Sequence, residues 1–234
     1  MKAEIGKTII VIPARGNSKG IKKKNLINFC GKPLLYWTIV QAKKSKFKKN
    51  IYVSSEDDRI LNYSKKLGVN AIKRPATLSK DDSSSESAIL HAVNSLTFKV
   101  KDIIFLQATS PLRKVNDINN AYNILKKTKS DSLFSCHKAE DYFDIWTYKN
   151  KKYIPLTINY KNRKPRQLFK PTHVCQNGSM YLFKKEILSE QNNRLGKKIN
   201  VYEMEEWQSL QLDDIKQLHT MELLFNKKLK KFYA

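Results

Sequence analysis

Along the first half of the chain, short and nearly continuous apolar runs alternate with longer stretches in which apolar residues recur at helical spacing. Thr8–Pro13 (TIIVIP) is such a run, typical of a strand buried on both faces of a parallel sheet. In the stretch Leu34–Lys44, the residues Leu35, Ile39 and Ala42 fall on one stripe of a helix. The pattern therefore predicts a strand followed by a helix.

The same alternation continues through the first half of the chain. It predicts, in order, strand Asn50–Ser54, helix Asp57–Leu67, strand Asn70–Lys73, helix Ser85–Leu96, strand Asp102–Gln107, helix Asp117–Thr128 and strand Ser130–His137. This order indicates the α/β class, with an open, mostly parallel central sheet and helices on both faces. Ligands in such folds bind beyond the carboxyl ends of the strands. We therefore expect a site at the residues that follow Ile12, Ser54, Lys73 and Leu106.

From about Ala139 the pattern changes. Short extended stretches, Trp146–Ile158 and Leu168–Val174, surround the polar and basic segment Tyr160–Gln167, which predicts a hairpin-like arm that leaves the sheet. The remaining expected elements are the strands Ser179–Phe183, Lys198–Tyr202 and Ser209–Leu212, and the terminal helix Ile215–Lys231. We expect one domain over residues 1–234, with an inserted arm at residues 140–175.

The composition permits one substantial core but does not identify a partner. The chain has 234 residues, of which 41% are hydrophobic, and a net charge of +24 from 45 basic and 21 acidic residues. Only seven of the basic residues are Arg, the residue on which nucleic-acid readers usually rely, and the Lys residues are spread along the whole chain. We interpret the charge as compositional bias and expect no nucleic-acid partner. A basic nucleic-acid-binding protein stays open as the alternative from a different class.

Cysteines and the N-terminal region point to an intracellular, non-membrane protein. Cys30, Cys136 and Cys175 lie far apart and form no CxxC pair, which argues against a disulfide framework and against a zinc site. The apolar run Thr8–Ala14 is too short to span a membrane, and it leads into Arg15 and a Lys-rich stretch rather than a cleavage site. We expect a cytoplasmic protein without membrane association.

The segment after the first strand carries most of the candidate chemistry. Small residues in Arg15–Gly20 (RGNSKG) let backbone N–H groups approach an anion, and the basic side chains up to Asn25 can neutralise a polyphosphate. It is not a Walker A loop, because a loop using Gly31 and Lys32 would need glycine where Leu26 stands. A solvated basic loop remains the alternative on these residues alone.

Several motifs together resemble one enzyme family. They are IPARGNSKGIKKKN (12–25), GKPLLYWTI (31–39), YVSSEDDRI (52–60), KRPATLSKDDSSS (73–85), LQATSPLR (106–113), NGSMYLF (177–183) and, more loosely, SLQLDD (209–214). In this order and approximate spacing they resemble the CMP-sialic acid synthetases, or acylneuraminate cytidylyltransferases, of the sugar nucleotidyltransferase superfamily. The resemblance covers nearly the whole chain. It implies a Rossmann-like three-layer α/β/α nucleotidyltransferase fold with a small dimerisation arm.

The resemblance also implies a reaction and its residues. The anomeric hydroxyl of an acidic nine-carbon sugar would attack the α-phosphate of CTP, and pyrophosphate would leave with the assistance of Mg²⁺. Arg15 and Lys19 would hold the triphosphate and stabilise the transition state, with Asp213 as the metal-binding acid. The nucleotide would be bound by Ala14, Arg15, Gly16, Lys19, Lys24, Asn25, Arg74, Ser83 and Ser85. The sugar would be bound by Gln107, Arg166 and Asn177, and the arm would build a homodimer.

Two positions depart from the family's pattern. The family usually ends with a pair of acids that positions Mg²⁺, whereas this chain has Gln211 before Asp213. If Ser209–Leu212 is a strand, Gln211 and Asp213 share a face, and a Gln carbonyl oxygen with one carboxylate and substrate phosphates can still hold the ion. We therefore expect retained metal dependence.

The second departure is CQNG at Cys175–Gly178, where relatives often have RPNG. The missing Arg suggests a different acid sugar, such as a legionaminic-type nonulosonate beside N-acetylneuraminic acid, or a charge supplied by His173 or Lys170. Both departures keep a rival of the same fold open: a nucleotidyltransferase that acts on a sugar 1-phosphate and yields a nucleoside diphosphate sugar.

Overall fold

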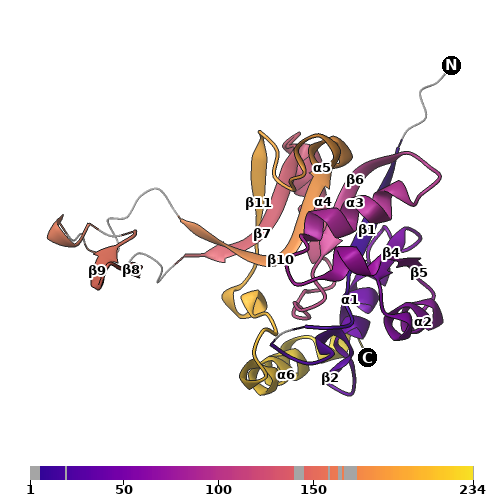
Figure 1. Cartoon of the computed structure of the whole chain (residues 1–234), viewed down its shortest axis with the longest axis horizontal. Coiled ribbons are helices and arrows are strands. Elements are labelled where there is room, and N and C mark those ends of the chain that lie inside the picture. Colours follow the sequence, from indigo (N-terminus) through magenta and orange to yellow (C-terminus); the bar gives the residue numbers. More distant parts are fainter. Residues whose placement is uncertain are drawn as a thin grey trace.

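The computed structural model describes residues 6–18, 20–139, 145–157, 159–162, 165 and 173–233. Its centre is a seven-stranded sheet with the order β11-β7-β10-β6-β1-β4-β5 (Figure 1). The strands are β1 (Lys7–Pro13), β4 (Ile51–Ser55), β5 (Asn70–Lys73), β6 (Val100–Leu106), β7 (Ser132–Lys138), β10 (Val174–Lys184) and β11 (Ile199–Glu203). Strand β10 pairs antiparallel with β6 and β7, whereas the other neighbours pair parallel. The prediction of a mostly parallel central sheet is confirmed.

Helices cover both faces of this sheet (Figure 1). They are α1 (Leu34–Lys43), α2 (Asp58–Lys66), α3 (Ser85–Asn94), α4 (Asp117–Lys127), α5 (Lys185–Gln191), α6 (Lys216–Lys228) and α7 (Lys230–Tyr233). Along β1, Ile10 and Ile12 pack into the core on the side of α1, α2 and α4, while Ile9 and Val11 pack into the core on the side of α3 and α5. Because successive side chains of a strand point to opposite faces, this split shows that β1 is buried between two helical layers. The expected α/β/α layering is confirmed.

A third apolar cluster attaches the C-terminal helices to the first helix. Phe225 of α6 stacks edge-on against Phe29 at 5.5 Å and lies 4.3 Å from Trp37 of α1, both measured between ring centroids. The short strands β2 (Asn28–Phe29) and β3 (Lys32–Pro33) and the 3-10 helix η1 (Lys24–Leu26) complete this region. It fixes the loop after β1 against the end of the chain.

The expected strand Ser209–Leu212 is wrong. Glu206–Ser209 forms the 3-10 helix η5, which a capping box between Glu205 and Gln208 closes, and the next residues are irregular. The Leu212 N–H donates to the Thr109 carbonyl at 2.9 Å, and no ladder follows. The argument that Gln211 and Asp213 share a strand face therefore loses its basis.

Two further boundaries differ from expectation. Strand β10 begins at Val174, five residues before the expected Ser179, and its pairing with β7 shifts register between Gln176 and Tyr181. The terminal helix is divided into α6 and α7 around Leu229.

A hairpin lies within the first of the two expected extended stretches, and the predicted arm built from both stretches stays a prediction. Strands β8 (Trp146–Lys149) and β9 (Lys152–Pro155) pair antiparallel as a separate two-stranded sheet, which stands away from the main body in Figure 1. Most of the expected stretch Leu168–Val174 lies outside the described residues. None of the helices in the described parts of the chain combines the length and hydrophobicity needed to traverse a bilayer.

Candidate functional site

A cavity of about 290 Å³ opens at the carboxyl ends of β1, β5 and β6. Its wall consists of the loop after β1, the 3-10 helix η2 (Ala76–Ser79) with the residues that follow it, the start of α3 and the end of β6. The lining residues include Arg15, Ser18, Lys24, Asn25, Arg74, Ser83, Ser84, Ser85, Phe105 and Gln107. The site therefore lies where the carboxyl-end rule for parallel strands places it.

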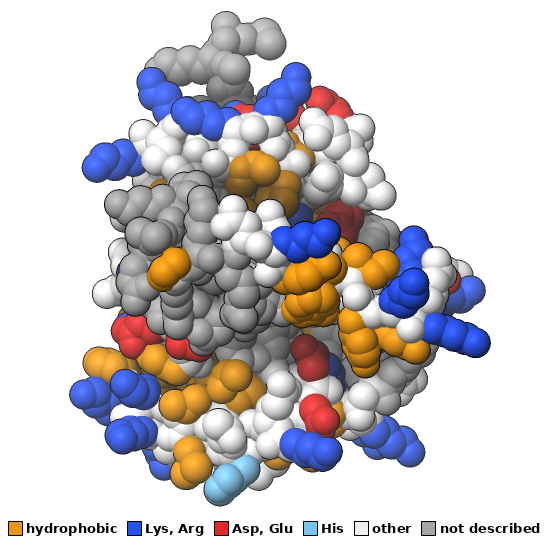
Figure 2. All heavy atoms as spheres, turned by 90° about the vertical axis from the view of Figure 1, so that its left-hand side faces the viewer, with side chains coloured by type: hydrophobic (Ala, Val, Ile, Leu, Met, Phe, Trp, Pro, Cys, Tyr) orange, Lys and Arg blue, Asp and Glu red, His pale blue; other side chains and the backbone are white. Residues whose placement is uncertain are grey.

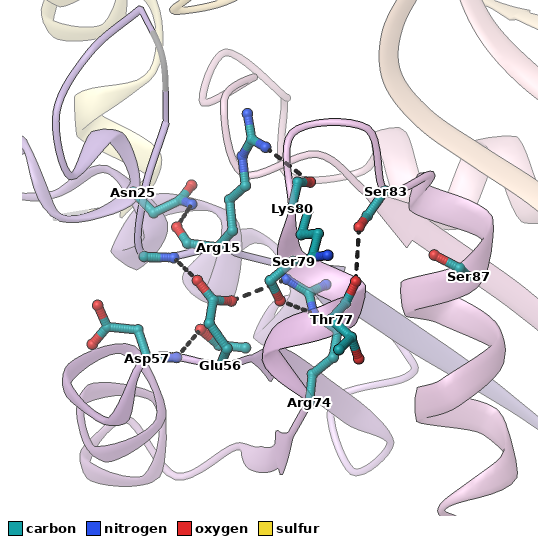
Figure 3. Close-up of polar contacts among 12 residues, drawn as sticks. Arg15, Asn25, Glu56, Asp57, Arg74, Thr77, Ser79, Lys80, Ser83 and Ser87 are labelled. Carbon is teal, nitrogen blue, oxygen red and sulfur yellow. Dashed lines mark hydrogen bonds and ion pairs between the residues drawn. The ribbon is translucent and has the colours of Figure 1, made fainter.

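Glu56, directly after β4, joins two walls of the cavity (Figure 3). Its carboxylate accepts a hydrogen bond from the Gly16 N–H at 2.6 Å and one from Arg74 Nη2 at 3.2 Å. Arg74 also donates through Nε to Ser79 Oγ at 2.8 Å. The first loop, β4 and η2 are thereby held in one arrangement.

The ionisation of Glu56 follows from these contacts. Burial by itself would raise the pKa of this carboxyl group, but hydrogen bonds from the backbone N–H groups of Gly16 and Glu56 and the charge of Arg74 outweigh it. The pKa of Glu56 therefore lies below its usual value, and the group is a carboxylate at neutral pH.

Only glycine, which has no Cβ atom, fits at position 16 of this network. A Cβ atom at Gly16 would collide with Oδ2 and Cβ of Asp57, the residue that caps α2 by accepting from the Arg59 N–H. The backbone of the loop thus lies directly on the start of α2. Ala14 is buried just before it and donates its N–H to the Ser54 carbonyl at 2.9 Å.

Arg15 points across the cavity mouth to the residues after η2 (Figure 3). Its Nη1 donates to Asp81 Oδ1 at 2.9 Å and approaches the Lys80 carbonyl at 3.4 Å. The Arg15 and Asp81 side chains are 33% and 45% exposed, so their ion pair contributes little and can be exchanged for an anionic ligand. Lys19, predicted to act with Arg15, lies outside the described residues.

Lys24 and Asn25 close the other side of the loop. The Asn25 side chain donates to the Arg15 carbonyl at 2.8 Å and so ties the two ends of the loop together. Lys24 Nζ donates to Asp213 Oδ1 at 2.8 Å, with the lysine side chain 13% exposed and the carboxylate 66% exposed. Asp213 is therefore placed at the cavity through a lysine that lines it.

The serines at the start of α3 cap the helix and line the cavity. Ser84 is the N-cap, since its side chain accepts from the Ser87 N–H, whereas Ser83 Oγ approaches the Thr77 carbonyl at 3.3 Å (Figure 3). Ser85, the first residue of the helix, lines the cavity. Capping by Ser84 fixes the backbone that carries Ser83 and Ser85 toward the cavity.

Gln107 presents an unsatisfied atom at the end of β6. Its Oε1 is buried and has no hydrogen-bond partner among the described residues, although the side chain lines the cavity. Buried polar atoms are rarely left unpaired unless a ligand or water completes them. This marks Gln107 as a ligand-facing group.

Arg113 holds the backbone on which Gln107 stands. Its Nη2 donates to the carbonyls of Gln107 at 2.5 Å and Ser179 at 2.6 Å, and its Nη1 donates to Gln41 at 3.0 Å and Thr38 at 3.3 Å. The side chain is fully buried, which lowers the pKa of Arg113 to about 10 and still leaves it charged at neutral pH. Arg113 is a positioning residue that ties β6 to β10 beside the cavity.

Asn177 and Gln211 face the protein. Asn177 is 4% exposed, and its side-chain Oδ1 accepts from Ser135 Oγ at 2.6 Å and from the Ser179 N–H at 3.1 Å. Its backbone carbonyl accepts from Gln211 Nε2. Between them lies Gly178 at φ +70°, where a Cβ atom would collide with the Gln211 amide. The geometry gives Asn177 an internal role, and its predicted contact with the sugar stays a prediction.

The predicted Mg²⁺ site stays a prediction, and one group has the chemistry that it requires. Asp213 offers an exposed carboxylate, and one carboxylate with substrate phosphates and water is an ordinary Mg²⁺ site. Gln211 has a different partner, Asn177, and in the described parts of the chain no three His, Cys, Asp or Glu side chains gather as a metal-binding group. The residues present fit an ion that shares its ligands with a bound triphosphate.

The sugar side of the site is described in part. Arg166 and Lys170 lie outside the described residues. Cys175 is half-buried in β10 and pairs in register with His137 of β7.

Two site residues, Glu56 and Arg113, were not identified from the sequence. Glu56 follows Ser54, one of the strand ends after which we expected a site, so its position in the sequence could have identified it. Arg113 belongs to a recognised motif, but its burial depends on contacts with α1 and β10 that no local pattern shows.

Known proteins resemble this chain over most of its length. A family model described as Cytidylyltransferase matches residues 9–232. N-acylneuraminate cytidylyltransferase A of Danio rerio is 32% identical over 208 residues, which are 87% of this chain and 47% of that protein. Pseudaminic acid cytidylyltransferase of Campylobacter jejuni subsp. jejuni is 36% identical over 138 residues, or 57% of this chain and 60% of that protein. The chain thus spans about half the length of the first relative.

Among solved structures, the fold is similar to that of CMP:2-keto-3-deoxy-manno-octonic acid synthetase complexed with CTP. The TM-score is 0.73, with 18% sequence identity, over 96% of this chain and 100% of that one. At this identity the likeness concerns the fold.

Proposed function

The chain belongs to the cytidylyltransferase family, and we propose that it transfers the cytidylyl group of CTP to a nonulosonic, sialic-type sugar acid, giving the CMP-sugar and pyrophosphate. The observation that supports this proposal is a cavity lined together by Arg15 and Lys24, by the serines at the start of α3 and by Gln107, whose side-chain oxygen has no partner among the described residues. The reaction needs cations beside the triphosphate, polar residues beside the nucleotide base and an amide group that faces the sugar.

The triphosphate belongs at the loop after β1. Arg15 and Lys24 would exchange their exposed carboxylate partners for phosphate oxygens, and Lys19 would add a third cation. Arg74 and the residues around Ser83 and Ser85 would form the walls around the cytosine. Since Glu56 and Asn25 fix the loop in advance, little reorganisation opposes binding.

The sugar belongs beside Gln107. Its anomeric hydroxyl oxygen would form a bond to the α-phosphorus as the bond from that phosphorus to the bridging oxygen of pyrophosphate breaks, and the hydroxyl proton would leave to solvent. Catalysis of this kind depends on alignment and on neutralising spread negative charge. Arg15 and Lys24 supply positive charge on the nucleotide side, and Arg113 fixes the strand that aligns Gln107.

Magnesium would be held by Asp213 together with substrate phosphates, with Gln211 as a further oxygen ligand once it releases Asn177. When bound, the ion would neutralise negative charge on the phosphates.

One experiment tests this function directly. The purified protein is incubated with each of four nucleoside triphosphates, crossed with a panel of nonulosonic acids and a panel of sugar 1-phosphates, and pyrophosphate release is measured. We expect release with CTP and at least one sugar acid. Turnover restricted to sugar 1-phosphates, or absence of turnover with CTP, contradicts the proposal.

A further inference from the structure

Arg194, in the loop between α5 and β11, covers two aromatic rings. Its guanidinium carbon lies 4.5 Å from the ring centroid of Tyr181 and 5.4 Å from that of Phe105. The two rings are stacked on each other, with centroids 5.5 Å apart and planes at 16°. A cation placed over ring faces in this way is held in one orientation.

This cluster borders the cavity through Phe105. Phe105 of β6 lines the cavity, and Gln107 directly follows the end of this strand. The Gln107 N–H still donates to the Ser179 carbonyl of β10 at 3.2 Å, so the alternation of side chains places Phe105 and Gln107 on the same face. Tyr181 pairs in register with Phe105 on β10. Arg194 therefore lies on the same sheet face as the ligand-facing glutamine, on the side where β6 meets β10.

Glu86 of α3 holds Arg194 by an ion pair. Arg194 Nε donates to Glu86 Oε1 at 2.6 Å, and the two side chains are only 22% and 13% exposed. Glu86 follows Ser85 in the first turn of α3. Among the described residues, Nη1 and Nη2 of Arg194 have no hydrogen-bond partner, so a positioned fork of N–H donors remains available.

We infer that Arg194 and Glu86 form a specificity subsite that binds the carbonyl oxygen of an acylamino substituent on the sugar. The inference rests on the proposed function. A fork of donors selects an acceptor, and because Glu86 balances the charge of Arg194, a neutral amide carbonyl suits the pair better than a second carboxylate. The stacked rings keep this pair largely out of water, so an unmatched substituent is disfavoured.

The test compares nonulosonic acids that differ in one substituent, with either an acylamino or a hydroxyl group at the same carbon. The variants are Arg194→Leu, Arg194→Lys and, as a matched control in the same loop, Lys197→Leu, which removes an exposed cation. We measure kcat/KM for each sugar and KM for CTP, together with the melting temperature of each variant.

For Arg194→Leu we expect kcat/KM to fall about 10- to 100-fold with the acylamino sugar and less than about threefold with the hydroxyl sugar, at unchanged KM for CTP. Arg194→Lys keeps the charge but not the fork and should lose discrimination likewise, which covers the case that the leucine variant does not fold. Lys197→Leu should behave as wild type.

The outcomes separate the two proposals. If the wild type turns over sugar acids with CTP but both Arg194 variants affect the two sugars equally, or raise KM for CTP, the inference about Arg194 is overturned alone. If the wild type releases no pyrophosphate from CTP with any sugar acid, the proposed function itself fails.

Discussion

At the scale of single residues, the candidate site depends on one carboxylate that binds no substrate. Glu56 accepts from Gly16 and Arg74 and so joins the loop after β1 to the wall that would hold the base. A neutral amide can keep the shape of this side chain but not its charge. Protonation of Glu56 and ligand binding in the cavity are therefore coupled.

Glu56→Gln should lower stability at neutral pH by about 1–3 kcal/mol, because hydrogen bonds to a charged acceptor are replaced by weaker ones. The pKa of Glu56 is lowered in the folded state, so its contribution is complete above the unfolded pKa of about 4.3 and is lost as pH falls through the lower folded value. Melting temperatures measured from pH 7 to pH 3 should therefore converge between wild type and variant. A constant difference over that range would contradict the assignment.

Gly178 allows a second test at this scale, with a matched control. Gly178→Ala should cost about 1 kcal/mol for the left-handed backbone, plus the collision with Gln211. Gly31→Ala has a similar φ of +81° and nothing within 4 Å of the new Cβ, so it measures the backbone cost alone. We expect the larger loss of stability, and a raised KM for the sugar, in Gly178→Ala; equal effects would remove the steric argument.

Substitutions at Asp213 and Asp214 distinguish a metal-binding role of Asp213 from the general effect of losing an acidic side chain. Asp213→Asn should lower kcat by about 100-fold or more and raise the Mg²⁺ concentration needed for half-maximal rate, since the single carboxylate of the proposed site is lost. Asp214→Asn, which removes a carboxylate that accepts from the Lys216 N–H, should keep most of the activity. Full activity in Asp213→Asn, or turnover in chelator, would contradict the metal assignment.

The sequence led to the cavity but not to the orientation of every side chain. Arg15, Arg74 and Gln107 line it because each follows the carboxyl end of a strand that local patterns reveal, and Lys24 lines it from η1 at the end of the first loop. The Asn177 side chain accepts from Ser135 on the neighbouring strand, a contact that the sequence did not reveal, and its predicted contact with the sugar stays a prediction. Side-chain direction at a bulge depends on such long-range partners, which one sequence does not display.

At the scale of elements, helix α3 shows how one serine run serves stability and binding. Ser84 caps the helix and also lines the cavity, whereas Ser85 lines the cavity without capping the helix. Ser84→Ala should lower the unfolding free energy by about 1 kcal/mol, whereas Ser85→Ala should leave it nearly unchanged and raise KM for CTP. Chemical denaturation and steady-state kinetics on the two variants check this, and an exchange of the two phenotypes would contradict the division.

Regular elements with strong periodicity were predictable, whereas irregular ones were not. The strands β1, β4 and β6 each contain a short apolar run that is typical of a buried sheet. The segment Ser209–Leu212 has the alternation of a strand, but the capping box at Glu205 and Gln208 closes a 3-10 helix that takes in Ser209, and the residues after it are irregular. The early start of β10 was hidden by the polar residues of its bulge.

At the scale of the whole molecule, positive charge and apolar surface are distributed differently. Lysines are scattered over the surface, while Figure 2, which looks at the molecule from the hairpin side, shows hydrophobic side chains gathered in patches bordered by Lys and Arg. The hairpin contributes exposed apolar side chains, among them Trp146, Tyr148, Tyr153 and Ile154. A hairpin that cannot bury such residues on its own body is typical of an interface.

We propose that this hairpin holds two copies of the chain together. Tyr148 and Tyr153 face each other across the strands, with ring centroids 4.9 Å apart, and are 63% and 73% exposed. The double variant Tyr148→Ser and Tyr153→Ser should shift the protein from dimer to monomer in light scattering after gel filtration, with an unchanged melting temperature for the sheet core. The double variant Ile215→Ser and Leu223→Ser is the matched control and should leave the dimer intact. These two side chains, at the start of α6 and within it, are 52% and 57% exposed. A monomeric wild type, or dissociation by the control alone, would contradict the hairpin interface.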